Sequence, residues 1–175
     1  NFLPYQGYID ANNHFLNSLL GGAFIRLFNS DHIVVVRLSS LVGLIIYGLA
    51  AFSLKRHFKS PLAHLSVIAA LLFSPYLIEF FSLARGYGLS WALLLLAISL
   101  QMDYFRQANL WKLLLSALAF LLASYANLAL ISLSAFGLIL LLIKNIKKPI
   151  RIACLLPFIG GLSYLIRYAF DLQDG

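Results

Sequence analysis

LLLSALAFLLASYANLALISLSAFGLILLLI, the stretch at residues 113–143, holds 31 consecutive positions without a charge. An apolar run this long, without strand-like alternation, predicts helix in a lipid bilayer. As one helix it would extend about 46 Å, against a hydrocarbon core of about 30 Å. Basic residues flank it on both sides: Arg106, Lys112, Lys144, Lys147, Lys148 and Arg151. Because basic flanks stay in the cytoplasm, we predict two short crossing helices that turn near 124–127.

The composition of the whole chain agrees with a membrane setting. Hydrophobic residues make up 62% of the 175 positions and charged residues 11%, whereas soluble domains carry about 45–50% and about 25%. Backbone polar groups in lipid must be satisfied within each segment, so we expect an all-α fold. The net charge of +7 does not indicate nucleic-acid binding, because most of the basic residues fall in loops on one side of the predicted topology. The single cysteine, Cys154, excludes an intrachain disulfide and a cysteine-based zinc site.

Further apolar segments complete a polytopic transmembrane helical bundle. Pro61 falls in the first turn of one span, where its missing N–H is harmless. Pro75 lies inside the same span and should kink it. The chain begins at Asn1 without a methionine or a leader, so we expect a fragment of a longer protein. We predict one transmembrane domain over 1–175, with spans at about 32–54, 61–83, 88–104, 113–125, 127–143 and 149–170.

One topology places the basic loops together. Only Asp103 among the acidic residues falls on the same side. By the positive-inside rule that side is the cytoplasm. The prediction is a multi-pass protein of the bacterial inner (plasma) membrane, with residues 1–31 outside the cytoplasm. Nine of the 13 basic residues then lie inside: Lys55, Arg56, Lys59, Arg106, Lys112, Lys144, Lys147, Lys148 and Arg151.

The outer segment 12–28 has apolar residues at helical spacing along one face and polar residues on the other. It is short for a span, so we predict an amphipathic helix lying in the outer interface. The apolar face consists of Phe15, Leu16, Leu19, Leu20, Ala23, Phe24, Leu27 and Phe28.

A first polar cluster, NNHFLN at 12–17, opens this helix. In one interpretation Asn12 or Asn13 caps the helix and His14 faces water. In the other, the polar side, with Asn17, closes over a site at the membrane surface.

A second outer cluster joins Glu79 to ARGYG at 84–88. A glycine-rich turn would explain it, with Arg85 anchored among headgroups and Glu79 as its partner. Yet ionisable groups at membrane depth are functional candidates, and arginine grips a phosphate in a bidentate manner. Glycines on either side would let the backbone approach a ligand closely. Spacing alone leaves both interpretations open.

The segments NHFLN at 13–17, VRLSS at 36–40 and ARGY at 84–87 resemble bacterial GT-C glycosyltransferases, relatives of protein O-mannosyltransferases and of enzymes that add sugars to lipid A. An outer loop of that family ends in an acidic-or-amide, Lys-or-His motif followed by prolines, and an R-L-P-S signature opens the next span. Phe15 and Ser39 stand where proline is usual. Short hairpin spans such as 113–143 are also typical, so the resemblance implies a GT-C-like fold.

The resemblance implies transfer of a sugar from a polyprenyl-phosphate donor to a lipid or glycan acceptor on the extracytoplasmic side. His14, Asn13, Arg85 and Tyr87 would then bind the donor phosphate, with Glu79 and Asn17 in support. Asp10 is the candidate catalytic carboxylate within the chain, although the family's base usually lies farther upstream, before Asn1. No metal-ligand spacing is present, while a divalent cation at the phosphate stays compatible with this chemistry.

Two other classes stay open. A transporter or flippase fragment would use Arg85 and Glu79 to line a substrate path, and discontinuous helices occur there too. A purely structural membrane subunit is the third. An enzyme should gather its polar residues at one membrane face, whereas a carrier should place some near the midplane.

Overall fold

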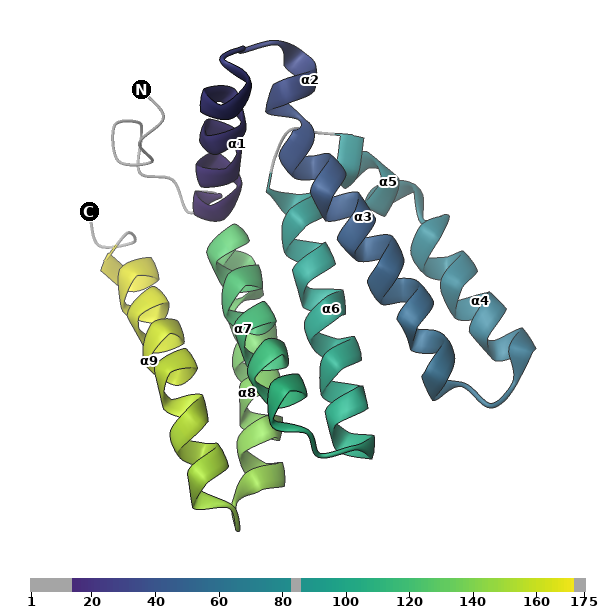
Figure 1. The fold of residues 1–175 in the computed structure, drawn as a ribbon, viewed down its shortest axis with the longest axis vertical. Coiled ribbons are helices and arrows are strands. Elements are labelled where there is room, and N and C mark those ends of the chain that lie inside the picture. Colours follow the sequence, from purple (N-terminus) through teal and green to yellow (C-terminus); the bar gives the residue numbers. More distant parts are fainter. Residues whose placement is uncertain (1–13, 83–85, 172–175) are drawn as a thin grey trace.

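The computed structural model describes residues 14–82 and 86–171, and these residues are almost entirely helical (Figure 1). The elements are α1 (Phe15–Phe28), α2 (Ile33–Val36), α3 (Leu38–Ser53), the 3-10 helix η1 (Leu54–His57), α4 (Pro61–Leu72), α5 (Pro75–Ser82), α6 (Tyr87–Arg106), α7 (Leu110–Ala126), the 3-10 helix η2 (Leu128–Leu130), α8 (Ile131–Asn145) and α9 (Pro149–Asp171).

Four helical segments in the described part are long and apolar enough to cross a membrane. They are Leu38–His57, Tyr87–Arg106, Leu128–Asn145 and Pro149–Asp171, with mean hydropathies from 1.4 to 2.1. The 17 residues of α7 extend about 25 Å, slightly less than a hydrocarbon core. The chain is therefore an all-helical, membrane-embedded protein.

Helix α6 is the centre of the bundle, with α3 on one side and α7 on the other (Figure 1). Small residues allow these close approaches, as is usual between membrane helices. Ala97 on α6 and Ala117 on α7 are fully buried. A Cβ on Gly43 of α3 would lie 3.0 Å from the Cα atom of Leu89, so the two backbones nearly touch. Helices α8 and α9 pack beyond α7.

The uncharged run 113–143 forms two helices, and its break falls within the predicted turn. Helix α7 ends at Ala126, and Asn127 is extended, with φ −156° and ψ 114°. The Asn127 side chain accepts a hydrogen bond from the Ala129 N–H at 3.0 Å, which starts the next turn. Close packing joins the pair, because Gly137 on α8 leaves room for the ring of Phe120 on α7.

The predicted span 61–83 is broken rather than kinked. Helix α4 stops at Leu72 and α5 starts afresh at Pro75. Proline has no N–H to donate to the carbonyl of Leu71 four residues earlier. The hydroxyl of Tyr47 on α3 donates to that carbonyl instead, at 3.2 Å. This contact from a neighbouring helix satisfies a group that lipid could not, so a full break is tolerated.

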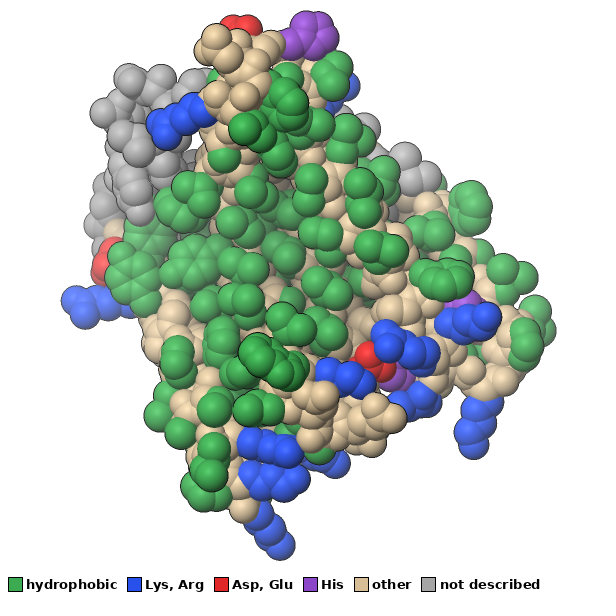
Figure 2. Space-filling model, viewed as in Figure 1, with side chains coloured by type: hydrophobic (Ala, Val, Ile, Leu, Met, Phe, Trp, Pro, Cys, Tyr) green, Lys and Arg blue, Asp and Glu red, His purple; other side chains and the backbone are tan. Residues whose placement is uncertain are grey.

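Successive long helices run in opposite directions, so three loops meet at one end of the bundle (Figure 1). We call this the basic end, because the nine basic residues predicted to lie together are carried by the segments 55–59, 106–112 and 144–151 (Figure 2). The opposite end carries α1, the start of α6 and the turn between α7 and α8.

Helix α1 covers most of the segment that was predicted as an interfacial helix. It runs along the bundle, roughly parallel to α7, rather than across it (Figure 1). Only its first turns reach the core, where Leu16 and Leu20 pack. Much of the rest of the predicted apolar face is not packed against the core, and Leu27 is 75% exposed. Packing of two residues at i and i+4 against the bundle therefore sets the direction of α1.

Candidate functional site

His14 joins the two polar clusters that the sequence analysis singled out. It directly precedes α1, and its Nδ1 lies 2.9 Å from the carbonyl oxygen of Ala126, the last residue of α7. Its ring meets the Tyr87 ring edge-on, with centroids 4.4 Å apart and planes at 76°. Residues about 70 positions apart in the sequence thus form one site at the end opposite the basic end.

The partner of His14 exists because α7 stops where it does. The last carbonyls of a helix lack intrahelical donors, and the extended Asn127 leaves that of Ala126 available. A carbonyl oxygen only accepts, so Nδ1 of His14 donates. In the neutral ring Nε2 then carries the lone pair and can take a proton from a hydroxyl group. When protonated, the same nitrogen can donate to a phosphate oxygen.

The position of His14 also corrects the interpretation in which an asparagine caps α1 and the histidine faces water. The N-cap residue is His14 itself, and it forms no side-chain capping bond. Its half-buried ring is used for tertiary contacts instead. Asn17 follows three residues later, close to His14 along α1, and is half-buried.

Gly86 provides the surface on which the His14 ring rests. A Cβ at Gly86 would lie 2.6 Å from the Cβ and 2.8 Å from the Nδ1 of His14. The backbone of Gly86, at φ −65° and ψ −3°, suits any residue. The glycine is therefore required by the close approach of His14, not by backbone conformation.

Tyr87 opens α6 and lies between two rings. One is that of His14, and the other is that of Phe80 on α5, at a centroid distance of 5.4 Å. Glu79 precedes Phe80 and has an exposed side chain. Helix α5 thus places the predicted supporting carboxylate on the element that contacts Tyr87.

Three predicted site residues, Asp10, Asn13 and Arg85, lie outside the described residues. Of the predicted set, the structure brings His14 and Tyr87 into direct contact.

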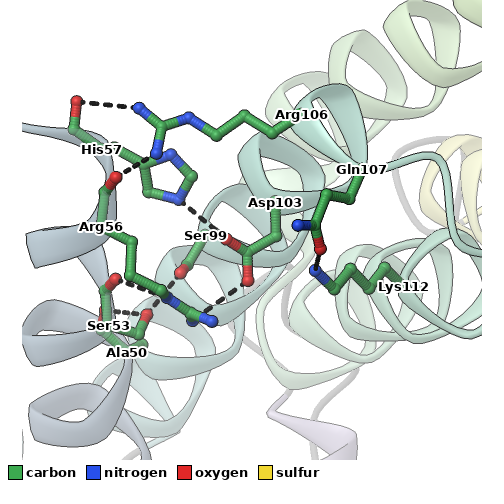
Figure 3. Close-up of polar contacts among 9 residues, drawn as sticks. All are labelled: Ala50, Ser53, Arg56, His57, Ser99, Asp103, Arg106, Gln107 and Lys112. Carbon is green, nitrogen blue, oxygen red and sulfur yellow. Dashed lines mark hydrogen bonds and ion pairs between the residues drawn. The ribbon is translucent and has the colours of Figure 1, made fainter.

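A second polar centre, which the sequence analysis missed, lies at the basic end (Figure 3). The buried carboxylate of Asp103 on α6 lies 3.0 Å from Nη2 of Arg56 and 3.1 Å from Nε2 of His57. Arg106 donates to the backbone carbonyls of Arg56 and His57. Below them the hydroxyls of Ser53 and Ser99 bond to each other. These contacts fasten η1 to α6 with the acid fully engaged by protein groups, which indicates a structural role.

A signal for this centre was present in the sequence. Asp103 is the only acidic residue among the basic loops, and an isolated acid in such surroundings predicts an ion pair.

In residues 14–82 and 86–171, no three His, Cys, Asp or Glu side chains are grouped so that they could hold a metal ion.

Comparisons with protein-family models, with curated proteins and with solved structures find no match. The fold defines the class of protein, an all-helical membrane protein with a histidine-centred site at one end.

Proposed function

We propose that the protein is the membrane portion of a GT-C-like glycosyltransferase, which moves a sugar from a polyprenyl-phosphate donor to a lipid or glycan acceptor at the extracytoplasmic face. The observation that carries the proposal is the contact of His14 with Gly86 and Tyr87. The family resemblance assigns both segments to the donor phosphate, while residue chemistry alone indicates a phosphate only for the segment of Arg85.

The place of this contact suits a lipid-linked donor. A polyprenyl chain stays in the hydrocarbon, while its phosphate and sugar lie at the interface. The contact lies where α6 begins and α7 ends, and on the proposed topology a headgroup of the outer leaflet would lie at this end of the bundle. Arg85 directly precedes Gly86 in the sequence, and the proposal assigns its guanidinium to the donor phosphate. The leaving group is a phosphate, and a fixed cation beside it stabilises the charge that develops during transfer.

The acceptor hydroxyl needs a base, and two residues of the chain offer one. Asp10 is the candidate carboxylate, and Nε2 of His14 is the second basic atom of the site. With Asn13, Asn17 and Glu79 in support, the site combines a proton acceptor with a cation, as transfer from a phosphate requires.

The basic end supports an orientation for the proposal. By the positive-inside rule its nine basic residues face the cytoplasm, which puts His14 and residues 1–31 on the outer side of a bacterial inner membrane. Cysteine introduced at the exposed Ala129 in the α7–α8 turn should react with a membrane-impermeant reagent from outside. Cysteine at Lys147 should react only after the membrane is opened. The reverse pattern would exclude this orientation.

The carrier alternative is less well supported by the buried polar groups. In the described part of the bundle, Ser116 donates to the carbonyl of Ala97 at 3.0 Å, and Gln101 donates to that of Gly137 at 2.8 Å. Both bonds join neighbouring helices. The described spans carry no charged side chain near their middle, where a carrier for a phosphate would need one.

The decisive experiment is sugar transfer by membranes that contain the full-length protein, with a radiolabelled polyprenyl-phosphate sugar as donor. Arg85→Ala should abolish transfer without loss of membrane insertion. Arg26→Ala, at an exposed position of α1, is the matched control and should keep its activity. Normal transfer by the Arg85 variant would remove the phosphate role. Movement of the lipid across liposome membranes without transfer would favour the carrier.

A further inference from the structure

Lys147 and Lys148 lie at the basic end, where exposed lysines outnumber the acidic groups that could pair with them. Nine basic side chains and one carboxylate give this end a net charge of +8. The carboxylate of Asp103 is already paired, and Arg151 donates to the Tyr104 hydroxyl at 2.9 Å. The side chains of Lys147 and Lys148 are exposed and form no hydrogen bond or ion pair within residues 14–82 and 86–171. Their charge is available to an outside anion.

An exposed apolar stripe leads along α8 to these lysines. Phe136, Ile139, Ile143 and Ile146 are 61%, 50%, 61% and 72% exposed. Their spacing of three, four and three residues places them on one face of the helix. The stripe covers about 15 Å along the axis, half of a hydrocarbon core. Lipid chains are the natural neighbours of such a face in a membrane-embedded helix.

We propose that the α8 stripe together with Lys147 and Lys148 is a binding site for an anionic phospholipid. One acyl chain lies along Phe136, Ile139 and Ile143, and the phosphate lies against the two ammonium groups. A zwitterionic lipid fits less well, because its own cation competes with the lysines. This site is independent of the proposed sugar transfer, which concerns the opposite end of the bundle.

The same pattern occurs a second time on α3. Ile45, Leu49 and Phe52 are 63%, 68% and 64% exposed at spacings of four and three residues. This stripe also ends at an exposed lysine, Lys55. Its repetition on a helix from another part of the bundle supports a common use, since basic residues at the cytoplasmic ends of spans attract anionic lipids.

The apolar residues among the lysines favour a lipid over an acidic protein. Ile146 and Ile150 are 72% and 78% exposed and flank Lys147 and Lys148. Such a mixture suits the boundary between headgroups and acyl chains, where amphipathic surfaces sit. A soluble acidic partner would leave the stripe on α8 unused.

The test uses the purified protein in dodecyl maltoside micelles, titrated with phosphatidylglycerol or with phosphatidylcholine of the same acyl chains, and counts bound lipids by native mass spectrometry. Phosphatidylglycerol should bind more tightly. The variant Lys147→Gln with Lys148→Gln should lower that affinity by up to about thirtyfold and leave phosphatidylcholine unchanged. High salt should reduce the difference between the two lipids.

Two matched variants keep the test specific. Arg26→Gln with Arg167→Gln removes the same charge from exposed positions at the opposite end and should bind like the unchanged protein. Phe136→Ser should weaken binding of long-chain phosphatidylglycerol but not of its dihexanoyl form, because Phe136 lies about 16 Å along the helix from Lys147 and only the long chain reaches it.

Several results would overturn the proposal. They are equal binding of the two lipids, unchanged binding by the double-lysine variant, and equal losses in both double variants. Inorganic phosphate that competes at the same concentration as the lipid would identify a site for free anions. Polyglutamate that binds through the same lysines, with no selective lipid binding, would identify a protein surface.

Discussion

Gly86→Ala is the sharpest perturbation that the structure offers, because its effect should pass entirely through His14. The new Cβ would lie 2.6 to 2.8 Å from three atoms of that side chain, closer than carbon and nitrogen atoms approach. The backbone at Gly86 accepts alanine without strain. The ring must therefore leave its position, and with it the bond to Ala126 and the contact with Tyr87.

The magnitude follows from these two contacts. A hydrogen bond contributes about 0.5–1.5 kcal/mol net, and an edge-on aromatic contact about 0.5–1.5 kcal/mol. Together they stabilise the docked start of α1 by about 2 kcal/mol. Loss of that amount should raise local opening about thirtyfold. Because Leu16 and Leu20 still pack against the core, the bundle itself should stay folded.

Hydrogen exchange of α1 in detergent micelles measures this effect. Exchange across Phe15–Phe28 should quicken in Gly86→Ala and stay unchanged in Gly48→Ala, because a Cβ at Gly48 meets no atom within 4 Å beyond its chain neighbours and its own helix backbone. A double-mutant cycle with His14→Gly, which removes all three of these atoms, isolates the cause. In that background the alanine at position 86 should have no further effect. An equal effect with and without the histidine ring would refute the reasoning.

Two further predictions concern the packing of the helices. Tyr47→Phe should lower thermal stability in micelles by about 1–3 kcal/mol, because the carbonyl of Leu71 loses the hydroxyl that donates to it beside the break before Pro75. An unchanged midpoint would show that another group satisfies this carbonyl. Gly137→Ala should cost about 1–3 kcal/mol, because its Cβ would lie 2.3 Å from the Phe120 ring, whereas Gly160→Ala, with open space, should be neutral or stabilising. Equal midpoints for the two alanine variants would contradict the α7–α8 packing.

The helices could be predicted from local patterns, because each depends on its own apolar length and flanking charges. The division of 113–143 depended on Lys112 and Lys144, and the break at Asn127 lies inside the predicted turn. The break before Pro75 could not be predicted. It depends on the hydroxyl of Tyr47, 24 residues from the carbonyl that it bonds, and only the packed structure shows that they meet.

The site was predictable in its parts but not in its assembly. The segments of His14 and Tyr87 could be selected as site candidates because polar residues are rare in so apolar a chain. Their contact depends on the end of α7, whose free carbonyl at Ala126 holds the histidine ring. At the other end, the sequence shows Asp103 as an isolated acid. Its burial could not be predicted, because it results from the packing of η1 on α6.

The turn between α7 and α8 has a consequence for how this part of the chain enters a membrane. On the proposed topology, only residues 127–130 must pass through the bilayer to reach the far side, and none of them is charged. The amide oxygen of Asn127 is already bonded within the turn, so little polar surface has to lose its water. On the same topology both basic flanks stay in the cytoplasm, where they are synthesised. The two helices can therefore insert together as a preformed pair, without a separate translocation step for either one.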